Sequence, residues 1–200
     1  MKRALYLLLL LALALAWRDW SHREIVHQPG VLVAELPRQL PADASAIIRL
    51  RDYSLTPRAR FELRARVLSR EDYRWDTGSG LAPMDLALGW GAMSDQAVLD
   101  RIEISQGARW YFTRYDPPAP LSDRDIIRHS SNMHVVPADA AILGRLRELR
   151  RGDLVWLSGL LVDADHDSGF RWRTSLSRED TGDGSCELFY VERVIIEPRK

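Results

Sequence analysis

The residues of this 200-residue chain that could do chemistry are few, and the first to consider are a thiol and an imidazole. Cys186 is the only cysteine, and His129 and His134 precede it. A cysteine becomes a nucleophile when a neighbouring base takes its proton, and a long sequence separation does not forbid that contact. Cys186 also alternates with Leu188 and Tyr190, which is typical of a small buried side chain. Cys186 and His134 are therefore catalytic candidates, with a place in the interior as the alternative for each.

An acidic cluster near the C-terminus is a candidate for binding a divalent cation. Asp180, Asp183 and Glu187 stand close together in the sequence, and carboxylate oxygens are the ligands that hard cations prefer. The first two also belong to a glycine-rich run that reads as a turn between strands. We keep these residues as metal candidates, and we expect no cofactor.

Three further aspartates alternate in the way that a calcium-binding loop begins. They are Asp163, Asp165 and Asp167, but the sixth position of the loop holds Ser168 instead of glycine and the twelfth holds Thr174 instead of glutamate. Without the bidentate glutamate, a solvated hairpin tip is the better interpretation.

Two Asp-Thr-Gly triads, at residues 76–78 and 180–182, invite comparison with aspartic proteases, in which two such loops bring their carboxylates together. Neither triad follows an apolar strand, and residues 183–200 are too few to complete a second lobe. Asp-Thr-Gly is also ordinary turn chemistry, so we reject the protease interpretation.

A broader feature is a set of arginines on expected strands. Residues 60–68 alternate cleanly, which predicts a strand with Arg64 and Arg66 on its outward face. Arg171 and Arg173 alternate in the same way near the C-terminus. If the two strands are neighbours, the four arginines form a patch for a phosphate or carboxylate ligand. The alternative is a solvated surface whose arginines pair with nearby acids.

The elements that must position these residues are centred on the C-terminal part of the chain. Residues 154–162 read as a central strand that is covered on both faces, and two more strands follow at residues 170–176 and around 186–195. A helix is expected at residues 139–150, before these strands. The pattern predicts a β-rich α+β domain, built as a curled antiparallel sheet or a small OB-like barrel with one main helix.

Shorter elements precede them. A strand is expected within residues 47–55, a hairpin at residues 101–114 and a strand or buried connector at residues 133–136. Short helices are expected at residues 83–88, where a proline stands near the first position, after Ser94-Asp95 and at residues 122–129.

The N-terminus predicts export or anchoring. Lys2 and Arg3 precede an apolar run over residues 4–17, and Ala14-Leu15-Ala16 offers a cleavage site. The run is either a signal peptide or a membrane-spanning anchor, and its positive flank places the rest of the chain outside the cytoplasm. We expect the protein in the inner membrane facing the periplasm, or periplasmic or secreted after cleavage. The domain plan is then a leader at 1–17, a tether at 18–44 and one globular domain at 45–200.

The charge balance and the cysteine content exclude one class of partner and one source of stability. The chain carries 28 basic and 28 acidic residues, so no whole-protein field attracts nucleic acid, and we expect no nucleic-acid partner. A single cysteine excludes an intramolecular disulfide, so packing must supply the stability.

The runs Leu88–Asp95 and Ser175–Glu187 resemble those of uncharacterised exported proteins of proteobacteria. The resemblance implies an envelope location and no particular activity. We therefore expect a binding or structural accessory protein of the cell envelope, with an anionic ligand or a partner protein. The alternative is an envelope hydrolase or metal-dependent enzyme that uses Cys186 and His134, or the loop with Asp180 and Asp183.

Overall fold

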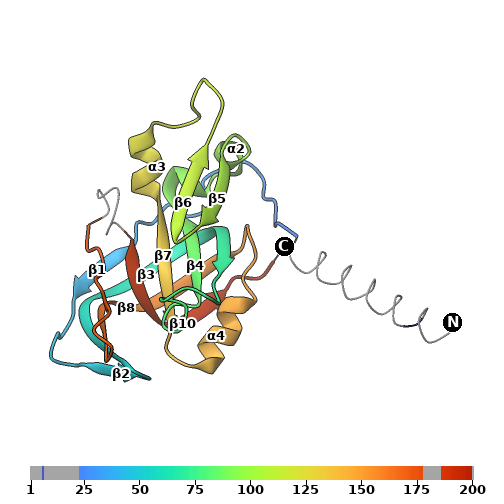
Figure 1. The fold of residues 1–200 in the computed structure, drawn as a ribbon. Helices are drawn as coiled ribbons and strands as arrows, with labels where there is room; N and C mark the ends of the chain where they lie inside the picture. Colours follow the sequence, from blue (N-terminus) through green and yellow to red (C-terminus); the bar gives the residue numbers. More distant parts are fainter. Residues whose placement is uncertain (1–5, 7–22, 178–185, 200) are drawn as a thin grey trace.

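A computed structural model describes residue 6 and residues 23–177 and 186–199 of the chain. These residues form a β-rich fold with short helices (Figure 1). The strands are β1 (Arg38–Pro41), β2 (Ile48–Leu50), β3 (Tyr53–Asp72), β4 (Met84–Gly89), β5 (Glu103–Gly107), β6 (Trp110–Arg114), β7 (Ser130–Pro137), β8 (Leu154–His166), β9 (Arg171–Trp172) and β10 (Glu187–Ile196). The helices are the 3-10 turn η1 (Gly91–Ser94), α2 (Gln96–Leu99), α3 (Asp123–His129) and α4 (Ala140–Arg147).

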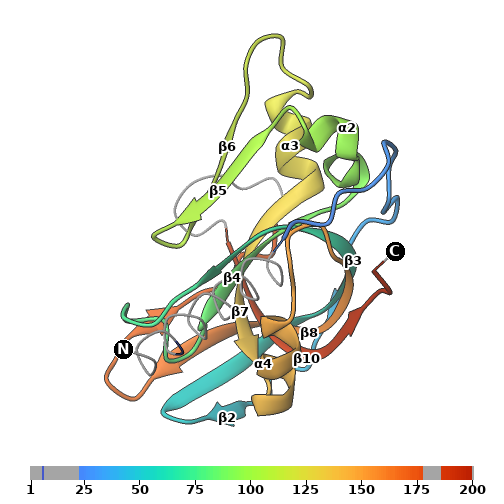
Figure 2. The ribbon, with the colours of Figure 1, turned by 90° about the vertical axis from the view of Figure 1, so that its right-hand side faces the viewer.

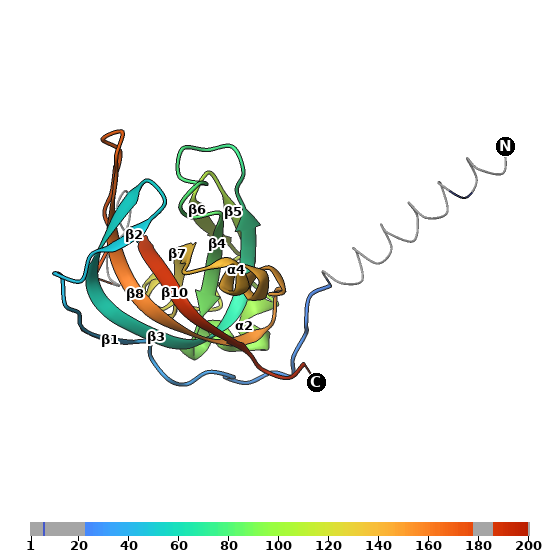
Figure 3. The same cartoon turned by 90° about the horizontal axis from the view of Figure 1, so that it is seen from below.

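Five strands of the main sheet pair in a succession that returns to its start. β3 pairs with β4, β4 with β7, β7 with β10, β10 with β8, and β8 with β3. Only the pairing of β7 with β10 is parallel among these five, so the sheet is mixed and not purely antiparallel as expected. Figure 3 shows β3, β8 and β10 curving together on one side and β4 and β7 opposite them. A second sheet consists of β5 and β6 alone.

The long strand β3 carries the alternation that the sequence predicts for residues 60–68. Phe61, Leu63, Ala65 and Val67 are buried in the main apolar core, with the inward side chains of β4, β7, β8 and β10. Burying these side chains is the main stabilising contribution, at about 1.5–3 kcal/mol for each large one. The expected central strand is confirmed as β8, which pairs with β3, β9 and β10.

The helix expected at residues 83–88 is wrong, because this segment is the strand β4. All six residues of β4 are buried, with β3 on one side and β7 on the other. A short run that is apolar all round fits a buried strand as well as a buried helix, and the tertiary pairing decides between them. Here Pro83 ends the preceding loop and begins no helix.

The other helix predictions are confirmed, each with a side-chain cap that accepts a main-chain N–H bond. Asp95 caps α2, Ser122 caps α3 and Asp139 caps α4. The expected hairpin at residues 101–114 is confirmed as β5 and β6. Figure 2 shows this hairpin with α2 and α3 at one end of the molecule, and α4 beside the main sheet at the other.

Part of the segment expected to be a tether packs on the domain. The main-chain N–H groups of Leu32 and Val33 donate to Oγ of Ser94 at 3.1 and 3.0 Å, and Val33 is completely buried. Ile25 donates to the carbonyl oxygen of Arg151 at 2.9 Å. The apolar run at 4–17 lies outside the described residues, apart from Tyr6. Within the described part of the chain, no helix has the length and apolar character needed to cross a membrane.

Candidate functional site

A row of polar side chains lies on the outer face of β4 and β7. Asp85 stands opposite His134 in the antiparallel pair, and Ala87 stands opposite Asn132. The neighbours of Asp85 on β4, Met84 and Leu86, point into the core, so alternation turns Asp85 to the other face. Asp85, Asn132 and His134 are nevertheless buried, because other elements cover this face.

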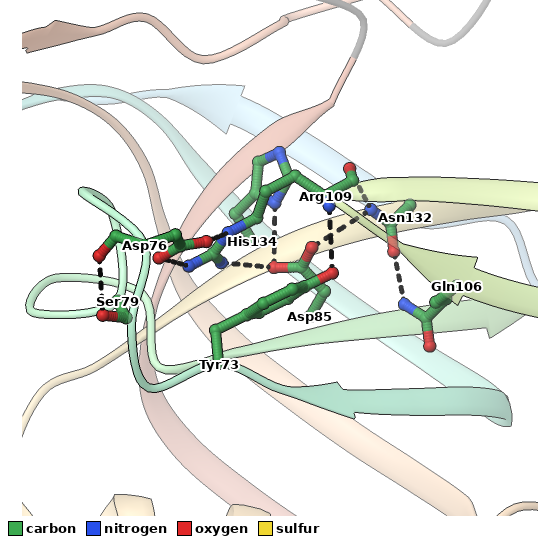
Figure 4. A network of polar contacts seen from close by, with 8 residues as sticks. All are labelled: Tyr73, Asp76, Ser79, Asp85, Gln106, Arg109, Asn132 and His134. Atoms are coloured by element: carbon green, nitrogen blue, oxygen red, sulfur yellow. Dashed lines mark hydrogen bonds and ion pairs between the residues drawn. The ribbon is translucent and has the colours of Figure 1, made fainter.

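The centre of the row is the carboxylate of Asp85, whose side chain is 0% exposed. Its Oδ1 accepts a hydrogen bond from Nδ1 of His134 at 2.9 Å and another from Nη1 of Arg109 at 2.9 Å (Figure 4). A buried carboxylate is strongly destabilising unless it is paired and hydrogen-bonded. Asp85 meets that condition through two residues that are distant in the sequence.

Arg109 comes from the turn of the β5–β6 hairpin and bridges two carboxylates. Its Nε and Nη2 donate to the two carboxylate oxygens of Asp76 at 2.7 and 2.8 Å, while Nη1 donates to Asp85. Its guanidinium lies 3.8 Å from the ring centroid of Tyr73 and 5.5 Å from that of Trp172. Planar stacking and two-sided hydrogen bonding are properties of arginine that lysine lacks.

The pKa values of these residues follow from the same contacts. The hydrogen bonds from Arg109, helped by its charge, lower the pKa of Asp76. Burial alone would lower the pKa of Arg109, but its bonds to Asp76 and the charge of Asp85 outweigh burial and raise it. Burial, with the nearby charge of Asp85, raises the pKa of Tyr73 to about 12. The network therefore keeps Asp76 ionised, Arg109 charged and Tyr73 neutral at ordinary pH.

The hairpin is attached to the main sheet by side chains. From its inner face, Gln106 donates to Asn132 at 2.6 Å, Tyr111 donates to Ser130 at 3.3 Å, and Ile104 packs in an apolar cluster. The turn itself is strained, since φ is +49° at Ala108 and +71° at Arg109, a region that favours glycine. The ion pairs of Arg109 offset that strain.

His134 has the orientation of a general base. With Nδ1–H donated to Asp85, the neutral ring has its acceptor at Nε2, and no hydrogen bond joins Nε2 to a residue that the structure describes. The ring centroid lies 4.7 Å from that of Trp172, which covers one face of the imidazole. His134 is thus a candidate base, and equally a satisfied interior histidine.

Cys186 directly precedes β10, the strand that pairs with the His134 strand β7. Leu188 of β10 is the register partner of His134 on β7, and Cys186 lies two residues before Leu188, in the bend that precedes the strand. The main-chain N–H of Ser175 donates to the carbonyl oxygen of Cys186 at 3.2 Å, and the thiol is partly exposed. Strand pairing therefore brings Cys186 to the end of the strand beside β7, and the contacts among the described residues include no hydrogen bond between Cys186 and His134.

The two arginine pairs singled out in the sequence do not meet. Arg64 lies opposite Trp156 on β8, whereas Arg171 lies opposite Asp165 of the same strand. These positions are nine residues apart along β8, which is about 30 Å of strand at roughly 3.3 Å per residue. The conditional expectation of one four-arginine patch is therefore not met.

Each of the four arginines already has partners. Arg64 donates to both oxygens of Glu197 at 2.5 and 3.0 Å, and Arg173 donates to Asp165 at 2.5 Å, with Arg171 at 3.7 Å from the same carboxylate. Arg66 lies on the outward face of its strand, but its side chain is not exposed, because it is buried and bonded to Gln96. The segment with η1 and α2 packs against this part of β3, so the outward face of the strand is shielded from solvent at Arg66.

The structure describes only part of the acidic set that the sequence predicts to bind a cation. Glu187 is buried and bonds to Ser131, while Asp180 and Asp183 lie outside the described residues. The aspartates of the calcium-like run, at 163, 165 and 167, pair with arginines instead of converging on a common point. In residues 23–177 and 186–199, no group of three potential ligands is placed to hold a metal ion.

Large aromatic side chains are exposed beside the Asp76–Arg109 ion pair. Trp75 precedes Asp76 and is 95% exposed, and Trp110 follows Arg109 and is 37% exposed. Phe112, two residues along β6, is 53% exposed and shares the outer face of the hairpin with Trp110. We call Trp75, Trp110 and Phe112 the aromatic rim.

Sequence reasoning missed the centre of this site, namely Asp85, Arg109 and Asn132. One signal was available, since Asp85 is the only charged residue within Met84–Gly89. Read as a buried strand, that segment would have required a partner for Asp85.

Comparison of the chain with protein-family models, curated proteins and solved structures finds no match.

Proposed function

We propose that this protein is an exported or membrane-tethered binding module of the cell envelope, built on an OB-like barrel. The basic residues and apolar run at the N-terminus support export. The cyclic succession of strand pairings, with α4 between β7 and β8, supports the OB-like interpretation of the fold. OB folds bind ligands at the face of their second and third strands, which correspond here to β4 and β7.

The binding surface is the aromatic rim, and one observation carries this assignment. Trp75 is 95% exposed although it stands next to Asp76, which is held by Arg109. A large aromatic side chain kept in water on an anchored loop marks an interaction site, especially with others beside it. Trp110 lies next to Arg109, so the ion pair between Asp76 and Arg109 brings the two indole-bearing segments together.

The charges of the site favour binding over catalysis. Arg109 is committed to Asp76 and Asp85, and Asp85 is committed to Arg109 and His134. Groups that satisfy one another in a buried network stabilise a surface, and they have little capacity left for a reacting molecule. We therefore assign the network to holding the rim, with a partner protein as the ligand.

The test uses the full-length protein in its native membranes. We expect photo-crosslinking from position 112 to give a discrete product, which disappears in the variant Trp75→Ala/Trp110→Ala. The matched control is Trp156→Ala, because Trp156 is 42% exposed but lies on β8. A product that survives the double substitution, or is lost equally in the control, contradicts the assignment to the rim. Recovery of the intact chain from the cytosol contradicts the envelope location.

A second candidate is an envelope hydrolase in which His134 is the base and Cys186 the nucleophile. The observation that favours it is the bond from Nδ1 of His134 to Asp85, which leaves Nε2 as the proton acceptor. A binding module retains its phenotype in the variants His134→Ala and Cys186→Ala when they fold. A hydrolase loses its phenotype in both variants while the fold remains intact.

A further inference from the structure

The outer edge of β6 has the geometry of a docking site for an extended peptide. We propose that the partner protein adds a strand to this edge and that Trp110 and Phe112 contact the side chains of the added strand. This inference rests on the proposed binding function and specifies the chemistry of the partner. Strand addition is a recurrent mode of peptide recognition, in which main-chain hydrogen bonds supply affinity and alternate side chains supply specificity.

The register of the hairpin determines which main-chain groups point outward. Gly107 pairs with Trp110 across the two-residue turn, and a pair that flanks such a turn exchanges both of its main-chain hydrogen bonds. Bonded and non-bonded pairs then alternate along the ladder. The main-chain N–H and C=O groups of Tyr111 and Thr113 therefore point away from β5.

This edge has no strand partner in the part of the chain that the structure describes. The second sheet contains β5 and β6 only, and no main-chain hydrogen bond joins Tyr111 or Thr113 to another described residue. Both strands of the hairpin lie near the main sheet, β5 near β3 and β6 near β7, and neither is paired with it. We assign the docking site to the β6 edge because the exposed aromatic side chains Trp110 and Phe112 belong to that strand.

The hairpin is held in place before any partner arrives. Arg109 ties its turn to Asp76 and Asp85, and Gln106 ties its inner face to Asn132. A strand that is already ordered loses little conformational entropy when a second strand pairs with it. An isolated two-stranded sheet is also only marginally stable, and a third strand adds the pairing that the hairpin lacks.

The side chains of the outer face indicate what the peptide carries. Trp110 and Phe112 lie opposite Gly107 and Ser105, whose small side chains leave the aromatic rings uncovered. The nearby charges are paired within the protein, Arg114 with Glu103 and Arg109 with Asp76. The edge therefore favours an uncharged extended segment with apolar residues at alternate positions.

The experiment replaces one outward N–H and leaves the hairpin ladder intact. Proline at Thr113 removes a donor that β5 does not use, and proline is tolerated at such edge positions. The matched control, Thr113→Val, keeps the N–H and the β-branched shape. The probe is a synthetic octapeptide that alternates valine and threonine between terminal lysines, followed by tryptophan fluorescence with the full-length protein. Circular dichroism and thermal unfolding confirm that both variants are folded.

We expect the peptide to bind the natural protein and Thr113→Val with equal affinity, and to bind Thr113→Pro roughly tenfold or more weakly. A peptide N-methylated at alternate amides is expected to bind weakly to all three proteins. Equal binding by a folded Thr113→Pro, or by the methylated peptide, overturns strand addition. If Trp75→Ala/Trp110→Ala still loses the crosslinked partner in that case, the binding function stands and only its mode is wrong.

Discussion

Nη1 of Arg109 and Nδ1 of His134 both lie 2.9 Å from one oxygen of Asp85, a side chain that is fully buried. One carboxylate thus joins the turn of the β5–β6 hairpin to the outer face of β7. Trp75 and Trp110 of the aromatic rim are the sequence neighbours of Asp76 and Arg109. The position of the rim therefore depends on Asp85, which holds Arg109.

Removing this carboxylate should be strongly destabilising. In Asp85→Ala, the half-buried Arg109 and the buried His134 lose a shared partner, and breaking a buried pair costs about 3–5 kcal/mol. The measurement is the free energy of unfolding from urea denaturation. The control is Asp167→Ala, whose pair with Arg49 is exposed and worth less than about 1 kcal/mol. Similar losses of unfolding free energy in the two variants would show that the contacts of Asp85 contribute no more to stability than an exposed ion pair.

Replacing Arg109 with lysine should loosen the β5–β6 hairpin. Arg109→Lys keeps the charge but cannot bond both oxygens of Asp76 while reaching Asp85. We expect hydrogen exchange of the amides at 103–114 to accelerate, while β4 and β7 keep their protection. The control is Arg114→Lys, which alters only an exposed pair with Glu103. Unchanged exchange in Arg109→Lys would mean that apolar packing alone holds the hairpin.

Acid should loosen the hairpin through Asp76. The pKa of Asp76 is lowered below its ordinary value of 3.8 in the folded protein, chiefly by hydrogen bonds from Arg109. A lowered pKa contributes stability that is present above the unfolded value and is lost as the pH falls through the folded one. Unfolding measured between about pH 5 and about pH 2, roughly one to two units on either side of the ordinary value, should show a stability loss that Asp76→Asn reduces. Parallel pH profiles for the two proteins would contradict this role.

Two glycines should respond to alanine in opposite ways. Gly152 has φ of +92°, and a Cβ there would collide with the carbonyl oxygen of Ile25 in the docked N-terminal segment. Gly152→Ala should therefore cost roughly 1–3 kcal/mol. Gly144 lies in α4 with open space around it, so Gly144→Ala should stabilise by about 0.5–1 kcal/mol. Thermal unfolding distinguishes the two, and a tolerated Gly152→Ala would show that residues near Ile25 do not pack tightly.

The comparison of sequence with structure is most instructive at β4. Local periodicity identified β3, β8 and β10, because each is long or alternates in a way that suits a strand. Met84–Gly89 has no such alternation, so the proline before it suggested a helix. Pairing with β3 and β7 made it a strand, and that decision also placed Asp85 opposite His134.

The arginines of β3 also show what alternation in the sequence cannot predict. Alternation correctly assigned Arg64 to the outward face of its strand, but it could not tell that Glu197 would reach it from the C-terminus. It placed Arg66 outward as well, where the segment with η1 and α2 covers it. Which residues cover a strand depends on contacts between distant parts of the chain, and periodicity carries no information about them.

Patterns among residues within a few positions of one another were enough to predict the β-rich class, the hairpin at residues 101–114 and the helices that became α2, α3 and α4. The sequence by itself also determined that no intramolecular disulfide can form. The meeting of Asp85 with Arg109 and His134 follows only from the folded arrangement, since the two partners lie 24 and 49 residues from Asp85 in the sequence. The physical reason is that a buried charge must find its partner wherever the folded chain brings one.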